Sequence, residues 1–313
     1  MVSDITPIQE KRTRRPRAMR VKDNLPGFRP GPRDPELVQY VYDFRFLTTD
    51  QLVALSGGDY TSVRKRLAKL YQHGYLDRRW DPPDNPRQGK AVYQLDRKGA
   101  ELLAQVKGID PGDLDWSVDR NKVEHVFVQH ALMVSRIRTV FTLAMRARPS
   151  VKLLFWRNDN ETRDSVKLDD DDPVYKGARR ETLPIVPDSF FGLEWPGARG
   201  YFMLEADRST MPRQDFLNKL RAYWLWHKAQ GHTKKLQINR FVVLTVTLSK
   251  ERARHLFEDS KKADDRGSGS AMFWFTTLEQ LTLEQPERAL QNIWVTWEKG
   301  QPARAALVPL QSS

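Results

Sequence analysis

The sequence predicts an α/β fold in two modules, and three observations carry this prediction. Residues 34–107 have the pattern of three short amphipathic helices, a β-hairpin and a further helix. Over residues 120–300, strand-like apolar runs alternate with helical patterns. One of these runs, RFVVLTVTL at 240–248, has the β-branched composition of a central buried strand. Between the modules, Gly, Pro and Asp gather in a linker at 108–119, and a tail is expected at 301–313.

The composition favours a cytoplasmic protein without membrane contact. At 313 residues and 39% hydrophobic content, the chain can bury a core in each module. No run approaches the roughly 18 apolar residues of a membrane span, and the start lacks the apolar stretch of a signal peptide. The chain has no cysteine, so disulfides and thiolate zinc sites are excluded. Metal chemistry would use carboxylates and histidines, which favours Mg²⁺ or Mn²⁺.

Residues 1–33 form a basic arm. They contain nine Lys or Arg and three acidic residues, which accounts for half of the net charge of +12. Such a segment cannot pack on itself and is expected to be disordered until it meets a polyanion. We expect it to contact DNA, or alternatively to act as a solubilising tail. The candidate DNA-binding residues of the arm are Arg12, Arg14, Arg15 and Arg17.

The first module begins with three predicted helices. DPELVQYVYDF starts at Asp34 with an N-cap and an apolar face. LTTDQLVALSG follows, with Thr48 or Thr49 as the cap. The third helix, in DYTSVRKRLAKLYQHGYL, buries an apolar stripe and ends at Gly74. Its outward face is basic and carries Arg64, Lys65, Arg66 and Lys69.

A β-hairpin follows, in which YLDRRW and KAVYQL flank the loop DPPDNPRQG, and a helix behind Asp96 closes the module. Three short helices and a hairpin are the layout of a winged helix-turn-helix, in which the third helix enters the major groove and the hairpin touches the backbone. We therefore predict sequence-specific binding of double-stranded DNA. A basic helix face can also be merely solvated, and some contacts would reach only phosphates. The predicted contacts are Arg64, Lys65, Arg66, Lys69 and, at the wing tip, Arg87.

The second module alternates helices and strands. We expect, in order, a helix from about Lys122 to Arg148, strands in VKLLFW, TLPIVPDSFFGLEW and YFMLEADRS, a helix from about Arg213 to Gln230, the strand at 240–248, a helix in SKERARHLFEDSKKA and a strand in AMFWFTT. The acidic run 169–172 lacks the ligand spacing of a calcium loop and is predicted to be solvated. His125 and His130 lie on the long helix, but they are five residues apart and therefore poorly aligned on one face, and we expect no acidic partner nearby. We interpret them as packing or DNA-facing residues rather than metal ligands.

Three acidic residues on two neighbouring strands are the candidate catalytic feature. Glu205 and Asp207 point to one face by the two-residue period of a strand, and Asp188 is reached across the intervening turn. Hydrolysis of a phosphodiester uses a divalent metal that neutralises charge and activates water. We therefore predict a Mg²⁺ or Mn²⁺ site at Asp188, Glu205 and Asp207. The alternative is an acidic strand end in which Asp207 pairs locally with Arg208.

The segments VPDSFF, YFMLEADRST and FLNKLRAYWLW resemble the replication-relaxation proteins of plasmids and mobile elements. The resemblance covers most of residues 35–300. It implies an N-terminal winged helix-turn-helix followed by a PD-(D/E)xK nuclease-like α/β domain with a mixed central sheet. Asp188 matches the PD element and Glu205 the first acid of (D/E)xK. Asp207 stands where the pattern has lysine, and Lys219 on the following helix is the candidate to replace it in assisting the water.

The residues predict a DNA-binding protein with a candidate nuclease site, and the resemblance implies that it belongs to a plasmid or mobile element and nicks or relaxes DNA. The catalytic residues would be Asp188, Glu205, Asp207 and Lys219. The alternative is a catalytically inactive transcriptional regulator, or an accessory replication or mobilisation factor, that uses the nuclease fold for dimerisation or DNA clamping. A relaxase or replication initiator is a candidate partner, and a homodimer would suit a palindromic site. An RNA-binding module is disfavoured because no basic sheet with interleaved aromatic residues is evident.

Overall fold

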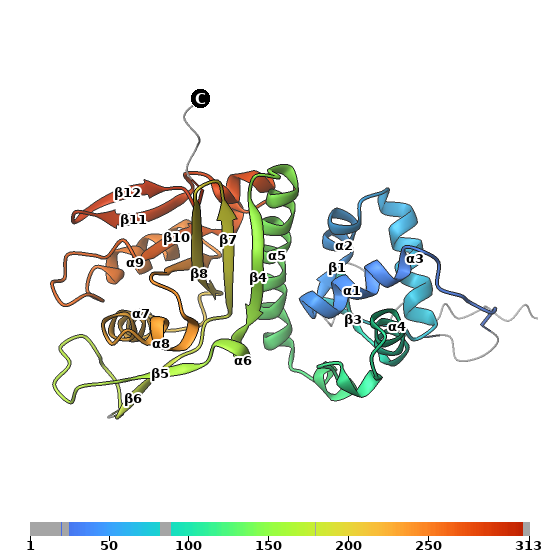
Figure 1. Cartoon of the computed structure of the whole chain (residues 1–313), viewed down its shortest axis with the longest axis horizontal. Helices are drawn as coiled ribbons and strands as arrows, with labels where there is room; N and C mark the ends of the chain where they lie inside the picture. Colours follow the sequence, from blue (N-terminus) through green and yellow to red (C-terminus); the bar gives the residue numbers. More distant parts are fainter. Residues whose placement is uncertain (1–19, 21–24, 82–88, 179, 309–313) are drawn as a thin grey trace, which may run out of the picture. The chain divides into compact units, whose positions relative to one another are not determined.

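The computed structural model describes residue 20 and residues 25–81, 89–178 and 180–308 (Figure 1). The chain divides into two compact units. Unit 1 comprises Met1–Val53 and Gly58–His125, and unit 2 comprises Ala54–Gly57 and Val126–Ser313. Five of the predicted DNA contacts lie outside the described residues, namely Arg12, Arg14, Arg15, Arg17 and Arg87. No described helix has the length and apolar character to cross a membrane.

Unit 1 has the predicted helices and hairpin, with one short additional strand. Its elements are α1 (Asp34–Phe44), β1 (Leu47–Thr48), α2 (Thr49–Ser56), α3 (Tyr60–Gln72), β2 (Leu76–Asp81), β3 (Lys90–Leu95) and α4 (Arg97–Lys107). The strands form an antiparallel sheet in the order β1-β3-β2. Helix α3 begins where Asp59 accepts the Ser62 N–H at 2.9 Å, which satisfies one of the free donors of its first turn.

Helix α3 buries Val63, Leu67, Leu70 and Tyr71 and leaves three of the four predicted basic residues exposed, Arg64, Lys65 and Lys69. Arg66 is a correction to the predicted outward face. Its guanidinium forms a bidentate ion pair with the buried carboxylate of Asp34 and lies 4.7 Å over the Phe28 ring. It therefore holds the start of α1 against α3.

The described part of the predicted arm packs on unit 1, contrary to the expectation that residues 1–33 are disordered throughout. Phe28 stacks on His73 with ring centroids 4.7 Å apart. Arg20 donates to the Leu76 carbonyl at 2.8 Å and pairs with Asp96. The predicted linker is also structured, since Leu114 is buried between the 3₁₀ turns η1 (Pro111–Asp113) and η2 (Val118–Asn121).

Unit 2 is built on a seven-stranded sheet in the order β12-β11-β10-β9-β8-β7-β4. The pairs β8–β9 and β9–β10 are parallel and the others antiparallel, so the predicted mixed α/β sheet is confirmed. Strand β9 lies at its centre, as its β-branched sequence indicated. The elements are α5 (His125–Ala147), β4 (Lys152–Asn158), β7 (Ser189–Trp195), β8 (Ala198–Asp207), α7 (Arg213–Lys228), α8 (Gly231–Leu236), β9 (Val242–Thr247), α9 (Lys250–Ser260), β10 (Phe273–Thr277), η3 (Leu278–Gln280), η4 (Pro286–Leu290), β11 (Trp294–Glu298) and β12 (Gln301–Ala305).

Helices cover both faces of this sheet, with α5 on one face and α7 and α9 on the other (Figure 1). The alternation of β8 separates the two cores. Met203 belongs to the core under α7 and α9, whereas Leu204 and Ala206 belong to the core under α5. Glu205 and Asp207 continue the Met203 side and therefore face α7 and α9.

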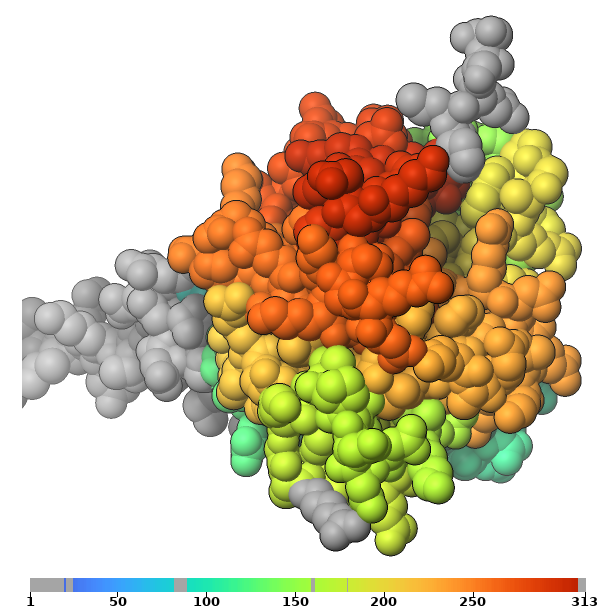
Figure 2. Space-filling view, turned by 90° about the vertical axis from the view of Figure 1, so that its left-hand side faces the viewer, coloured from blue at the N-terminus to red at the C-terminus, as the bar shows by residue number. Residues whose placement is uncertain are grey.

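The polar excursion, residues 159–188 between β4 and β7, contains secondary structure. It contains α6 (Asp159–Thr162) and a separate antiparallel pair, β5 (Asp164–Lys167) with β6 (Thr182–Ile185). Figure 2 shows the excursion beside the region of α7 and α8. The predicted solvation of the acidic run is wrong for Asp172, whose side chain is 5% exposed and pairs with the buried Arg221 at 2.6 Å.

Two strand boundaries also differ from the prediction. Asp188 does not lie in the middle of a strand. The predicted strand is divided into β6 and β7, and Asp188 immediately precedes β7. The expected tail contributes β12 to the sheet, and Leu307 and Val308 are buried beyond it. The core of unit 2 therefore continues past residue 300.

Candidate active site at the junction of strands β7 and β8

The junction of β7 and β8 brings Asp188 next to Glu205. The Asp188 N–H donates to the Leu204 carbonyl at 2.9 Å. The Ala206 N–H in turn donates to Asp188 Oδ2 at 2.7 Å. Asp188 thus contacts the backbone on both sides of Glu205, directly before the antiparallel pairing of the two strands begins at Ser189 and Leu204.

Glu205 is buried with only 3% of its side chain exposed, and α7 supplies both of its partners. Lys219 Nζ donates to Glu205 Oε2. The Tyr223 hydroxyl donates to Oε1 at 2.5 Å. Lys219 and Tyr223 are four residues apart and therefore share one face of the helix. Each oxygen of the buried carboxylate has a donor, as a buried polar group requires.

The electrostatics of the junction keep Lys219 charged and raise the pKa of Glu205 toward neutrality. Burial raises the pKa of Glu205 to about 7, and the nearby Asp188 carboxylate acts in the same direction against Lys219 and Tyr223. Burial alone would lower the pKa of Lys219, but the Glu205 and Asp188 carboxylates outweigh it and raise that pKa. Lys219 therefore remains cationic at neutral pH.

His130 of α5 contacts Asp188 from the other face of the sheet. Its Nε2 lies 3.0 Å from Asp188 Oδ1. The hydrogen bond to Asp188 raises the pKa of His130 against the effect of burial. The pKa of Asp188 is lowered, because His130 and Lys219 outweigh its own burial. The expectation that neither histidine has an acidic partner is wrong. His125 Nε2 lies 3.4 Å from Asp81 Oδ1, and the partner of His130 is 58 residues away in sequence, so only the fold brings them together.

Asp207 lies on the same face as Glu205 but has a different partner. Arg252 Nε and Nη2 contact its two oxygens at 2.9 and 3.0 Å, and Nη2 also donates to the Met211 carbonyl at 2.7 Å. Arg208 instead donates to Gln129 at 2.7 Å. The alternative of a local Asp207–Arg208 pair is therefore wrong, and Arg252 fixes Asp207 in a buried bidentate ion pair.

Two of the three predicted metal ligands, Asp188 and Glu205, lie at this junction. Within the described parts of the chain, no three His, Asp or Glu side chains are arranged to share a metal ion, and the third predicted ligand, Asp207, is bound by Arg252. Asp188 and Glu205 remain, with oxygen donors that suit Mg²⁺ or Mn²⁺. Such ions are often held by one or two carboxylates and several waters.

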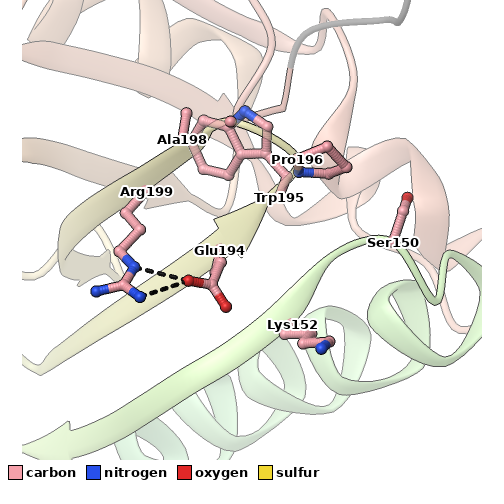
Figure 3. Close-up of a pocket in the computed structure, with 8 residues that line it drawn as sticks. Ser150, Lys152, Glu194, Trp195, Pro196, Ala198 and Arg199 are labelled. Carbon is pink, nitrogen blue, oxygen red and sulfur yellow. Dashed lines mark hydrogen bonds and ion pairs between the residues drawn. The ribbon is translucent and has the colours of Figure 1, made fainter.

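A separate hollow of about 780 Å³ opens at the other end of the same hairpin (Figure 3). Arg199 pairs there with Glu194 at 2.7 Å, beside Trp195 and Lys152. The β7–β8 register runs from Ser189 opposite Leu204 to Trp195 opposite Ala198. At about 3.3 Å per residue, the hollow lies roughly 20 Å from the acidic group. It contributes no side chain to the junction.

Comparisons with known proteins give one clear match. The model of the replication-relaxation family matches residues 38–238, more than half of the chain. No curated protein matches the chain. A solved structure of the restriction endonuclease FokI is similar at 9% sequence identity and a TM-score of 0.27, covering 81% of this chain and 43% of that one. This chain therefore spans less than half of that protein, and a similarity this low carries no functional argument.

Proposed function

The chain belongs to the replication-relaxation family, and from this membership we propose that it acts in DNA replication or processing by binding duplex DNA and cutting one strand. Unit 1 would bind the DNA. The junction of Asp188, Glu205 and Lys219 in unit 2 would cut it with the help of Mg²⁺ or Mn²⁺.

The exposed basic face of α3 supports DNA binding by unit 1. The order α1-β1-α2-α3-β2-β3 and the three-stranded sheet are those expected of a winged helix-turn-helix, in which the third helix enters the major groove. Arg64, Lys65 and Lys69 are exposed on α3 and available to bases or phosphates. Arg66 is not proposed as a contact, because its guanidinium is held by Asp34.

The contact of Lys219 with Glu205 is the observation that carries the proposed cleavage. The PD-(D/E)xK pattern needs a lysine beside two acids, and Asp207 occupies the position where the pattern has that lysine. Lys219 of α7 instead brings its Nζ to the Glu205 carboxylate. Two acids and a lysine are therefore gathered at one end of β7 and β8, on a mixed sheet with helices on both faces.

The charges at the junction suit the hydrolysis of a phosphodiester. A divalent ion held by Asp188 and Glu205 would supply a Lewis acid and a more acidic bound water. Lys219 keeps its positive charge because the acids raise its pKa, so it can stabilise negative charge that develops on the phosphate. Tyr223 and the Ala206 N–H hold the two carboxylates in place.

A second candidate function, a DNA-binding accessory factor without cleavage, is favoured by a different observation. Both oxygens of Glu205 already accept protein hydrogen bonds, and Asp207 is paired with Arg252. A catalytically inactive site would retain these contacts, because they satisfy buried charged groups. Unit 2 would then serve as a clamp or a dimerisation surface.

Nicking of supercoiled plasmid DNA separates these functions. We expect the wild-type protein to convert supercoiled into open-circular DNA in Mn²⁺ or Mg²⁺ but not in EDTA, and Asp188→Asn and Glu205→Gln to abolish the conversion. Glu194→Gln is the matched control, because Glu194 lies at the far end of the same hairpin. Wild-type DNA binding without metal-dependent nicking would leave only the accessory factor.

A further inference from the structure

We propose that His130 is a positioning residue that orients Asp188 for a divalent cation. The proposal rests on the proposed function, because it assigns Asp188 to metal binding. It adds a residue from α5 to a site otherwise built from β7, β8 and α7. His130 acts through Asp188 in this proposal and does not itself contact the metal or DNA.

Helix α5 can hold His130 firmly because its apolar side is packed on the sheet. Met133 and Ile137 follow His130 at helical spacing, and both are buried in the core under α5. The helix is therefore anchored directly after His130. The imidazole is 37% exposed, so it lies at the rim of that core with one side open to solvent.

The two hydrogen bonds of Asp188 fix the plane of its carboxylate. The Ala206 N–H engages Oδ2 at 2.7 Å from β8, and His130 Nε2 engages Oδ1 at 3.0 Å from α5. Asp188 lies between β6 and β7, outside both strands, so the strand pairing does not by itself orient its side chain. Each carboxylate oxygen has a second acceptor site, so both remain able to bind a cation.

The residue before His130 also reaches the junction. Gln129 accepts a hydrogen bond from Arg208, the residue that follows β8, at 2.7 Å. Consecutive residues of α5 thus contact the residue that precedes β7 and the residue that follows β8. This placement distinguishes His130 from a histidine that merely fills space on a helix.

Outer hydrogen bonds of this kind have a measurable effect on metal affinity. Removing a group that orients a metal-binding carboxylate or imidazole typically costs about 10- to 100-fold in affinity. We therefore expect His130→Ala to weaken Mn²⁺ binding by that factor. We expect His130→Gln to recover most of the affinity, because its Nε2 amide can donate to the same oxygen.

The test is a titration of the full-length protein with Mn²⁺, in which free Mn²⁺ is measured by electron paramagnetic resonance. Asp188→Asn reports whether the ion uses the proposed site. His255→Ala, at a half-buried histidine of α9 that contacts Arg254 and no residue of the junction, is the control. Circular dichroism and thermal unfolding check that each variant is folded. If His130→Ala fails to fold, His130→Gln and His130→Leu are compared, because only glutamine keeps a donor.

The outcomes separate the two proposals. Unchanged affinity in His130→Ala, or equal losses in the alanine and glutamine variants, overturns the role of His130 while the loss of binding in Asp188→Asn still supports the metal site. If the wild type binds no Mn²⁺, or if Asp188→Asn binds it as tightly as the wild type, the metal site fails and the role of His130 fails with it.

Discussion

Replacing Glu205 with glutamine should change how the stability of the protein depends on pH. Burial raises the pKa of Glu205 from 4.5 to about 7, so the folded chain binds this proton more tightly than the unfolded chain does. The stability from this proton is fully present below pH 4.5 and is lost as pH rises to about 7. At about 1.4 kcal/mol per pH unit, the loss is about 3 kcal/mol.

Glutamine cannot titrate, so the variant should lack this slope. We expect the free energy of unfolding of Glu205→Gln, minus that of the wild type, to increase by about 3 kcal/mol between pH 4.5 and 7 and to stay level above. Urea denaturation followed by tryptophan fluorescence, in EDTA and at several pH values, measures it. Glu194→Gln is the control because that side chain is 34% exposed. Parallel curves for the wild type and Glu205→Gln would refute the assigned burial and titration of Glu205.

Three further predictions concern unit 1 and its arm. Arg66→Ala leaves Asp34 buried without its cation and should lower the free energy of unfolding by about 2 to 3 kcal/mol; a loss below about 0.5 kcal/mol in chemical denaturation would contradict the structural role. Arg64→Ala should leave stability within about 0.5 kcal/mol but weaken specific DNA binding by about 1 to 3 kcal/mol if it reads a base, and gel-shift titration on matched and scrambled duplexes checks this. Deleting residues 2–19 should weaken all DNA binding equally and make its salt dependence shallower, whereas an unchanged salt slope would exclude a phosphate-binding arm.

Local patterns in the sequence predicted the elements that depend on them. The β-branched run predicted the central position of β9 in the sheet. The two-residue period predicted that Glu205 and Asp207 lie on one face of β8. The helical pattern placed Lys219 on the helix after β8, where its contact with Glu205 is found. These features follow from neighbouring residues, which is why one sequence suffices to predict them.

Contacts between residues far apart in the chain could not be predicted from the sequence. The partner of Asp207 is Arg252, 45 residues later, and the partner of His130 is Asp188, 58 residues later. Charge alone did not select these pairs from among many alternatives. Strand β12, with the sequence QPARA, has no apolar alternation and contains a proline, so only its pairing with β11 makes it a strand.

In the proposed site, Lys219 supplies the positive charge that Asp207 does not. The most direct test is the single-turnover nicking rate of Lys219→Met on supercoiled DNA in Mn²⁺, with Lys219→Arg as the charge-preserving comparison. We expect the methionine variant to nick at least about 100-fold more slowly than the wild type while it binds DNA with equal affinity, and the arginine variant to retain part of the rate. Equal nicking rates for the wild type and Lys219→Met would contradict the account.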